Sequence, residues 1–317
     1  MADRLFIGDI HGHADELEAL LAENGFQHAG GAWRHPSMIA VFCGDYIDRG
    51  PRQLDVVDIV RRMVDAGSAA AIQGNHEFNA VAWATEIPDE PGRHFRVRGT
   101  KNRAQHAAFL DAVGNDSEQH KEIVSWFRSL PLWVEFDGAV AIHACWHRDL
   151  QAELSGLTDA NHVLTEEGWF QALTKGARAY EITETLLKGP EVALPPGVTF
   201  FDKDGHERKN TRVRWWDNEA TTFRSAAIVD EETAAFLPDE ALGSDWLADL
   251  GEERLVFFGH YWMAGEPRIL HPRRTCLDFS VAKAGHLAAY RHEGETELDP
   301  EHLVWAGKPV PGLRPAG

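Results

Sequence analysis

The chain has 317 residues, of which 44% are hydrophobic, enough for a substantial core. Its 50 acidic residues against 31 Lys and Arg give a formal net charge of −19. This argues against general nucleic-acid binding, which draws its affinity from basic side chains. No apolar run of about 18 residues can span a bilayer and no signal peptide precedes the first strand, so we expect a cytoplasmic protein without a membrane segment. No linker-like stretch divides the chain, which favours one domain over residues 1–307 and a Pro/Gly-rich tail over 308–317.

The first predicted element is a short buried strand over residues 5–7, followed by the loop Gly-Asp-Ile-His-Gly-His over 8–13. Asp9 and His11 are two positions apart, so on an extended segment both side chains point to the same side. This spacing allows the two side chains to hold one metal ion. A helical spacing of apolar residues follows over 15–21.

Two further strands are predicted over residues 39–43 and 69–72, and each ends in a polar loop. The loops read Gly-Asp-Tyr-Ile-Asp-Arg-Gly over 44–50 and Gly-Asn-His-Glu over 74–77. A helical pattern over 54–62 lies between the strands, which predicts βαβ units. In open α/β sheets, ligands gather beyond the carboxyl ends of the strands, so we expect the three loops to converge on one crevice.

The loops supply ligands for a predicted pair of metal sites. Asp45 has two carboxylate oxygens and can bridge the ion held by Asp9 and His11 to a second ion. Asn75 offers a neutral oxygen to this second ion, which would be held weakly by Asp45 and Asn75 alone. Mixed nitrogen and oxygen ligands suit manganese, iron or zinc better than calcium. We therefore expect two divalent ions, with Mn²⁺ first and Fe or Zn as alternatives.

Two later histidines end strand-like runs and complete the second site. His143 follows residues 138–142, and His260 follows residues 255–259. In a chain with 17 histidines an isolated His is more often solvated than a ligand, but the position directly after an apolar strand favours the ligand interpretation. Residues 78–130, which precede the first of these strands, have a mostly helical pattern and are expected to form an insertion over the active face.

A second insertion, over about residues 151–215, contains Pro and Gly breaks that predict a loop-rich lid. Near its end, residues 209–216 read Lys-Asn-Thr-Arg-Val-Arg-Trp-Trp. If this segment is extended, Arg212, Arg214 and Trp216 point to one side and both guanidinium groups can face a phosphate. The alternative is an ordinary basic strand edge with its tryptophans in the core. We expect one of the two arginines at the substrate, with Arg214 preferred.

The last quarter of the chain contains strand-like runs over 275–279 and 287–291, which we expect in a second sheet. The three cysteines all lie in apolar or strand-like settings and give no disulfide framework: Cys43, Cys145 and Cys276. We expect them to be reduced and buried. Cys145 is two residues from a predicted ligand, so a redox-sensitive role is an alternative for it.

The order of motifs, Gly-Asp-x-His-Gly, Gly-Asp-x-x-Asp-Arg-Gly, Gly-Asn-His-Glu, His and Gly-His, resembles the phosphoprotein phosphatase branch of the calcineurin-like metallophosphoesterases. The resemblance spans about residues 4–290. It implies a four-layer α/β/β/α sandwich with helical insertions, where periodicity alone gives only an α/β fold. It also implies two ligand sets that share one residue: Asp9, His11 and Asp45 for one ion, and Asp45, Asn75, His143 and His260 for the other.

By the same resemblance His76 is the general acid, Asp48 orients it, and Arg49 holds the phosphoryl oxygens. Two cations can lower the pKa of a bridging water from 15.7 to roughly 7, so we expect direct attack by hydroxide without a covalent phosphoenzyme. A carboxylate next to an imidazole favours its charged form, and a guanidinium fork suits phosphate. The chain departs from the family after His143, where Ala-Cys-Trp replaces the usual two glycines.

The resemblance leaves the substrate open. Asp48 and Glu77 match the pattern of protein phosphatases, whereas residues 259–262 look more like the bacterial group that includes diadenosine tetraphosphatase. We expect a phosphomonoesterase acting on a phosphorylated protein or small molecule, with hydrolysis of dinucleoside polyphosphates as the alternative. A binding module without activity would have lost ligands or the acid, but all six ligand types and His76 are present.

Overall fold

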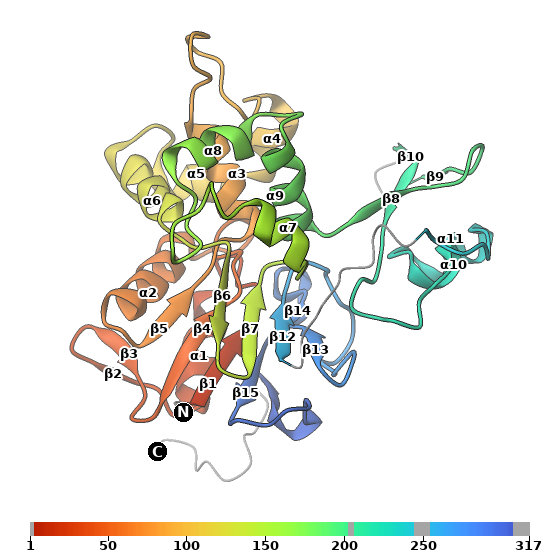
Figure 1. Ribbon diagram of the computed structural model, residues 1–317. Helices are drawn as coiled ribbons and strands as arrows, with labels where there is room; N and C mark the ends of the chain where they lie inside the picture. The colour runs from red at the N-terminus through yellow and green to blue at the C-terminus, as the bar shows by residue number, and fades with distance from the viewer. Residues whose placement is uncertain (1–2, 202–205, 244–253, 307–317) are drawn as a thin grey trace.

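The fold is built around two β-sheets, shown in the computed structural model of Figure 1, which describes residues 3–201, 206–243 and 254–306. Within these residues, the first sheet contains β14 (Asp278–Phe279), β15 (His286–His292), β1 (Asp3–Ile7), β4 (Met38–Phe42) and β5 (Ala69–Ala71) in that order, with β16 (Leu303–Trp305) beside β15. The second contains β13 (Arg274–Cys276), β12 (Leu255–Phe258), β7 (Ala139–Ile142) and β6 (Trp133–Phe136).

The two sheets share a buried apolar layer. Successive side chains of a strand point to opposite faces, so each strand contributes alternate residues to this layer. Phe6 of β1 stacks on Phe257 of β12, with ring centroids 3.9 Å apart. The remaining core of the layer comes from both sheets and their connections: Val41, Cys43, Ile72, Ala139, Ala141, Leu255, Leu277 and Tyr290.

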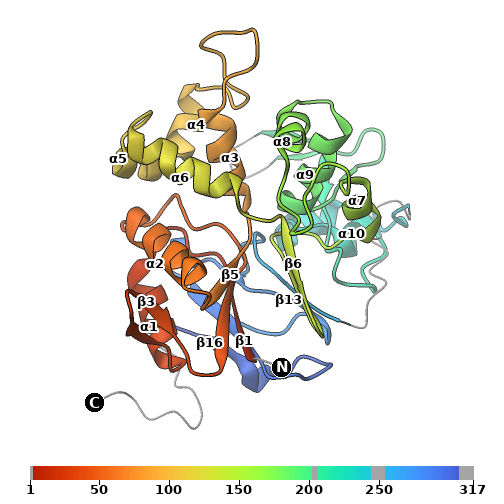
Figure 2. The ribbon, with the colours of Figure 1, turned by 60° about the vertical axis from the view of Figure 1, so that its left-hand side comes forward.

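Layers on the outer faces complete an α/β sandwich, which confirms the predicted fold class. Helices α1 (Ala14–Glu23) and α2 (Gln53–Asp65) contact the strands of the first sheet. On the outer face of the second sheet, the rings of Trp215 and Trp216 lie 4.9 and 5.1 Å from Phe258. Both insertions contribute to the region above the sheets, as Figure 2 shows.

Strand direction places the predicted loops together. Strands β1, β4 and β5 pair in parallel, and β7 and β12 also pair in parallel. Their carboxyl ends therefore lie at one edge of each sheet, beneath the helices of the insertions (Figures 1 and 2). The first insertion contains four helices among the described residues: α3 (Asn75–Ala84), α4 (Thr100–Gln105), α5 (Ala107–Val113) and α6 (Glu118–Arg128).

The second insertion contains helices and short strands: α7 (Arg148–Glu153), α8 (Glu166–Leu173), α9 (Arg178–Lys188), β8 (Glu191–Ala193), β9 (Phe200–Phe201), β10 (Glu207–Arg208) and β11 (Asn210–Arg212). It is followed by α10 (Phe223–Ala226) and α11 (Glu231–Phe236), which extend to the right in Figure 1 with β8–β11. The remaining elements are short: β2 (Gln27–Ala29), β3 (Ala32–Arg34) and the 3₁₀ turns η2 (Val281–Lys283) and η3 (Pro300–His302).

Two expectations about strands require correction. Residues 278–279 and 287–291 lie in β14 and β15 of the first sheet rather than in the second, and β15 pairs antiparallel with β1. This pairing covers an edge of β1 that would otherwise be open. Strand β11 ends at Arg212 and a turn follows, so the two-residue period does not reach Trp216, which is buried beside Trp215. The predicted tail over 308–317 lies outside the described residues.

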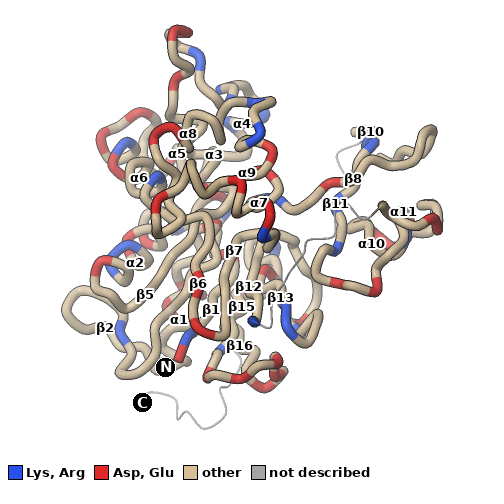
Figure 3. The backbone as a smooth tube through the Cα atoms, in the orientation of Figure 1, with Lys and Arg blue, Asp and Glu red and all other residues tan. Residues whose placement is uncertain are grey.

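The distribution of charge follows the composition. Figure 3 shows Asp and Glu over helices and loops, interspersed with Lys and Arg along the chain. In the part of the chain that the structure describes, no helix combines the length and apolar character needed to cross a bilayer.

Candidate metal and catalytic site

The loops that carry the predicted ligands have unusual backbone conformations. Non-glycine residues with positive φ are concentrated there: His11 (49°), Asp45 (53°), Asp48 (69°), Arg49 (78°), His260 (75°) and Trp262 (50°). Such conformations cost roughly 1–3 kcal/mol each and persist where the surrounding structure imposes them. Their concentration at one place indicates a candidate functional site.

Glycines allow the loops to approach one another closely. A Cβ atom on Gly259 would lie 1.9 Å from Oδ1 of Asp9, and one on Gly74 would lie 2.3 Å from the backbone nitrogen of Asp45. Neither position can accept a side chain without moving a predicted ligand. The glycines of the sequence motifs therefore serve the convergence of the loops.

Asp45 lies at the centre of two groups of potential ligands. Its carboxylate and the rings of His11 and His76 form one group, and its carboxylate and the rings of His143 and His260 form the other, with ligand atoms within 4.8 Å of one another. Asp45 Oδ2 lies 3.7 Å from His11 Nε2, and Oδ1 lies 3.4 Å from His143 Nε2. One carboxylate thus faces both groups.

Asn75 and Asp9 lie beside these groups. Asn75 Oδ1 is 2.6 Å from His260 Nδ1 and 3.1 Å from His143 Nε2. Asp9 belongs to neither group of close ligand atoms, but its carboxylate accepts the backbone N–H of His260 at 3.0 Å. Burial, followed by the charges of Asp278 and Asp45, raises the pKa of Asp9.

The hydrogen bonds that two histidines make through Nδ1 turn their Nε2 atoms toward the two groups of potential ligands. Nδ1 of His11 lies 2.9 Å from the Ile47 carbonyl, and Nδ1 of His143 lies 2.8 Å from the Cys43 carbonyl. A carbonyl oxygen only accepts, so each Nδ1 donates and each neutral ring presents an Nε2 lone pair. The Nε2 of His11 is buried without a hydrogen-bond partner among the described residues. Lone pairs that converge on Asp45 repel its carboxylate unless a cation lies between them, so the residues fit a divalent metal pair.

His76 is held by a second carboxylate. Its Nδ1 lies 2.5 Å from Asp48 Oδ2, whereas its Nε2 faces the first group and lies 3.9 Å from Asp45 Oδ2. Burial lowers the pKa of His76, but the charge of Asp45 and the hydrogen bond to Asp48 outweigh it and raise the pKa above its ordinary value. The ring therefore favours the charged form that a proton donor requires.

Three buried residues of this site were not predicted in these roles. His106, at the start of α5, places Nδ1 2.8 and 3.1 Å from the two oxygens of Asp48. Glu77 accepts backbone N–H groups from the Asp45 loop. Asp278 accepts the backbone N–H of Trp262 at 2.7 Å. The Glu77 motif was visible in the sequence, but no local pattern distinguishes His106 or Asp278.

Basic and aromatic side chains lie near the first group. The ring of Trp262 stacks on His11 with centroids 5.4 Å apart. Arg49 is exposed, and its guanidinium carbon lies 5.3 Å from the Trp262 ring centroid. The ammonium group of Lys283 lies 4.0 Å from the same centroid. An aromatic surface flanked by two cations thus adjoins the predicted ligands.

The structure separates the two arginines proposed for the substrate. Arg212 is partly buried and lies close enough to His260 for its charge to lower the pKa of that ring, after the larger effect of burial. The nearby Trp215 donates its indole N–H to the carbonyl of Ala144 at 2.8 Å, which anchors this segment next to His143. Arg214 is exposed.

All three cysteines are buried in the core. Burial raises the pKa of the Cys145 thiol far above its ordinary value. A neutral, inaccessible thiol does not favour the redox role considered for this residue.

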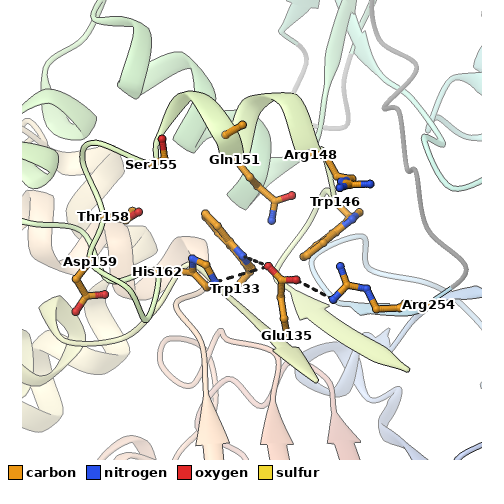
Figure 4. A pocket seen from close by; sticks show the side chains of 11 residues that line it. Trp133, Glu135, Trp146, Arg148, Gln151, Ser155, Thr158, Asp159, His162 and Arg254 are labelled. Atoms are coloured by element: carbon orange, nitrogen blue, oxygen red, sulfur yellow. Dashed lines mark hydrogen bonds and ion pairs between the residues drawn. The ribbon is translucent and has the colours of Figure 1, made fainter. Parts of the chain in front are cut away.

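A separate cavity of about 330 Å³ lies beside β6 and α7. Figure 4 shows that Glu135 joins its polar groups: Glu135 accepts from the indole of Trp133 at 3.2 Å and pairs with Arg254 at 2.7 Å. The ring of His162 stacks on Trp133 with centroids 4.3 Å apart. None of the predicted ligands lines this cavity.

Comparison with known proteins identifies the family. The family description "Calcineurin-like phosphoesterase" matches residues 4–261. The chain belongs to the calcineurin-like phosphoesterases. It is therefore an enzyme that hydrolyses phosphoric esters, as its motifs predict, and its ligand geometry agrees with the divalent metals that this family uses.

Curated relatives of this phosphoesterase are bacterial. It is 41% identical over 145 residues to the asymmetrical bis(5′-nucleosyl)-tetraphosphatase PrpE of Halalkalibacterium halodurans, a match that covers 44% of this chain and 55% of that relative. It is 39% identical over 206 residues to the PrpE protein of a Geobacillus species, with 59% of this chain and 80% of the relative covered.

The solved structures support the fold. A cold-active protein-tyrosine phosphatase of a psychrophilic Shewanella matches with a TM-score of 0.51 at 16% identity, covering 94% of this chain and 81% of that one. At this level of identity the likeness concerns the phosphoesterase fold and not the substrate.

Proposed function

We propose that this phosphoesterase hydrolyses dinucleoside polyphosphates with two divalent ions, Mn²⁺ first. The first ion would be held by Asp9, His11 and Asp45, and the second by Asp45, Asn75, His143 and His260. When bound, the ions supply an activated water and positive charge for the phosphoryl oxygens. His76 donates a proton to the leaving oxygen through Nε2, because Nδ1 is bonded to Asp48.

The observation that carries the substrate assignment is the set of cations around the ligands in a chain with net charge −19. Arg49 and Lys283 flank Trp262 beside His11, and the charges of Arg212 and Lys188 reach His260. A polyphosphate chain carries several negative charges, so it matches cations on both sides of the metal positions. The indole ring of Trp262 offers a surface on which a nucleobase can stack. The PrpE relatives support this assignment.

The acid pair favours a second candidate, the hydrolysis of phosphomonoesters, including phosphoserine and phosphothreonine proteins. The alkoxide that leaves such a substrate is strongly basic and needs a proton, whereas the nucleotide that leaves a polyphosphate is a weak base. The 2.5 Å contact between His76 and Asp48 is the feature that suits alkoxide leaving groups.

A panel of three substrates separates the two candidates. The Mn²⁺-loaded enzyme is assayed with diadenosine tetraphosphate, p-nitrophenyl phosphate and a phosphoserine peptide, and kcat/KM is compared. We expect diadenosine tetraphosphate to be preferred by about tenfold or more, equivalent to about 1.4 kcal/mol. A kcat/KM for the phosphopeptide that equals or exceeds the value for diadenosine tetraphosphate would overturn the polyphosphate assignment in favour of the second candidate. Asp45→Asn is the control for contaminating phosphatases.

A further inference from the structure

We infer that His106 is a positioning residue for proton donation: it fixes the carboxylate of Asp48, and Asp48 fixes His76. The inference rests on the proposed general-acid role of His76. It extends the pair expected from the sequence into a chain of three side chains, His106, Asp48 and His76.

The contacts of Asp48 leave its carboxylate no freedom to rotate. His76 Nδ1 lies 2.5 Å from Oδ2, and His106 Nδ1 lies 2.8 Å from Oδ1. The backbone N–H of Asp48 donates to Gln53 Oε1 at 2.6 Å, which fixes the main chain as well. Burial alone would raise the pKa of Asp48, but hydrogen bonds first from His106 and then from His76 hold it below its ordinary value. The carboxylate therefore stays ionised and oriented.

The surroundings of His106 restrict it to this single polar role. Its ring is fully buried, and Nε2 has no hydrogen-bond partner among the described residues. Because a carboxylate only accepts, the Nδ1 atom carries the proton. The ring centroids of Phe109 and Trp83 lie 5.2 and 6.0 Å from that of His106, and the two rings hold the imidazole in place. Burying the unpaired Nε2 atom costs free energy. A buried imidazole that bears this cost and directs its other nitrogen at Asp48 suggests a functional role for the contact.

The origin of His106 gives the first insertion a role in the chemistry. His106 joins α4 to α5, far from the motif loops in sequence, whereas Asp48 follows β4 and His76 begins α3. The first insertion thus supplies a side chain that contacts the pair formed by Asp48 and His76. Residues that orient a metal ligand through a hydrogen bond typically contribute about 10-fold to 100-fold to activity. We take the same range for His106, which acts through Asp48 on His76.

The test compares three substitutions at this position. His106→Leu keeps much of the volume and removes the donor. His106→Asn keeps an N–H close to the place of Nδ1, whereas His106→Gln keeps an amide but moves its N–H toward the place of Nε2. Each is assayed with p-nitrophenyl phosphate, whose leaving group needs no proton, and phenyl phosphate, whose leaving group is more basic. Metal content and the unfolding temperature are measured in parallel.

We expect His106→Leu and His106→Gln to lose about 10-fold to 100-fold in kcat on phenyl phosphate and little on p-nitrophenyl phosphate, with unchanged metal content. His106→Asn should restore most of the loss. If the His106→Leu variant does not fold, the comparison of His106→Asn with His106→Gln decides the same question. Equal losses on both substrates, or no difference between the Asn and Gln variants, would overturn the positioning role.

His76→Ala distinguishes failure of this inference from failure of the acid assignment. If His76→Ala also loses equally on both substrates, His76 is not the general acid and the role of His106 fails with it. If His76→Ala shows the selective loss and the variants of His106 do not, only the positioning role is wrong. The substrate panel with diadenosine tetraphosphate is independent of both outcomes.

Discussion

Glu77 accepts the backbone N–H of Asp45 at 2.9 Å, so a side chain in the first turn of α3 holds the loop that carries the shared ligand. The same carboxylate accepts from Tyr46 at 2.8 Å and from Gly74 at 3.0 Å. Both oxygens are therefore used, and two of the three motif loops are tied together by one buried side chain.

Replacing Glu77 by Gln should weaken this connection. The amide group would turn an N–H toward backbone N–H donors, which leaves buried groups unpaired at about 1–3 kcal/mol each. We expect a lower free energy of unfolding and incomplete metal loading, measured by denaturant titration and elemental analysis. Glu232→Gln, at an exposed position of α11, is the matched control. A Glu77→Gln variant that equals the wild type in both measurements would contradict this role.

Asp45→Asn should lower the content of both metals. The variant replaces one of the oxygens that face the two groups by an amide nitrogen, which does not bind a divalent cation. Asp9→Asn serves as the comparison. Asp9 is proposed as a ligand of the first ion alone, so this substitution should remove one equivalent of metal. Elemental analysis and turnover are the measurements. Two full equivalents with normal activity in Asp45→Asn would exclude a bridging carboxylate.

Arg212→Ala should weaken the inhibition by inorganic phosphate, whereas Arg214→Ala should leave it unchanged. Arg212 lies near His260 and Arg214 is exposed two residues later, which makes the second variant a matched control. A hydrogen bond to a charged group is worth roughly 1.5–3 kcal/mol, so the inhibition constant should rise about 10-fold to 100-fold. The opposite result would restore the preference that the sequence alone suggested.

The three thiols should not react with Ellman's reagent in the native protein. They are buried, and burial raises the pKa of each, so the reactive thiolate is scarce at neutral pH. In guanidinium chloride all three should be titrated. Rapid modification of one thiol in the folded protein, abolished in Cys145→Ser, would instead support a redox role for Cys145.

The predictions from sequence were most complete for ligand-type residues that directly follow a predicted strand. Asp9, Asp45 and Asn75 each follow an apolar strand and stand beside a glycine, so strand direction alone brings them to one edge of the sheet. In the structure Asp45 and Asn75 lie against the rings of the predicted histidines, whereas Asp9 lies beside the two groups and contacts the backbone of His260. The roles assigned to the three residues stay predictions. The sequence could not predict which sheet residues 287–291 join, because a strand of either sheet shows the same alternation of apolar residues.

The residues that sequence reasoning missed are those whose neighbours depend on tertiary packing. His106 stands in a helical stretch with no motif, and its contact with Asp48 spans 58 positions. Arg212 and Arg214 look equivalent in the sequence, and only the turn after β11 distinguishes them. The family resemblance did not help at these positions, because no motif fixes either the insertion or the second arginine.

The buried acids of the site have a consequence for folding itself. Asp9, Asp45, Glu77 and Asp278 are nearly inaccessible to solvent, and their charges act on one another. Burying carboxylates is costly unless counter-charges accompany them, and two divalent cations would supply four. The ions would then act as counter-ions of the native state, and each would stabilise it by about 2.7 kcal/mol at 100 times its dissociation constant. Chelation should therefore lower the unfolding temperature of the wild type, and it should have much less effect on Asp45→Asn.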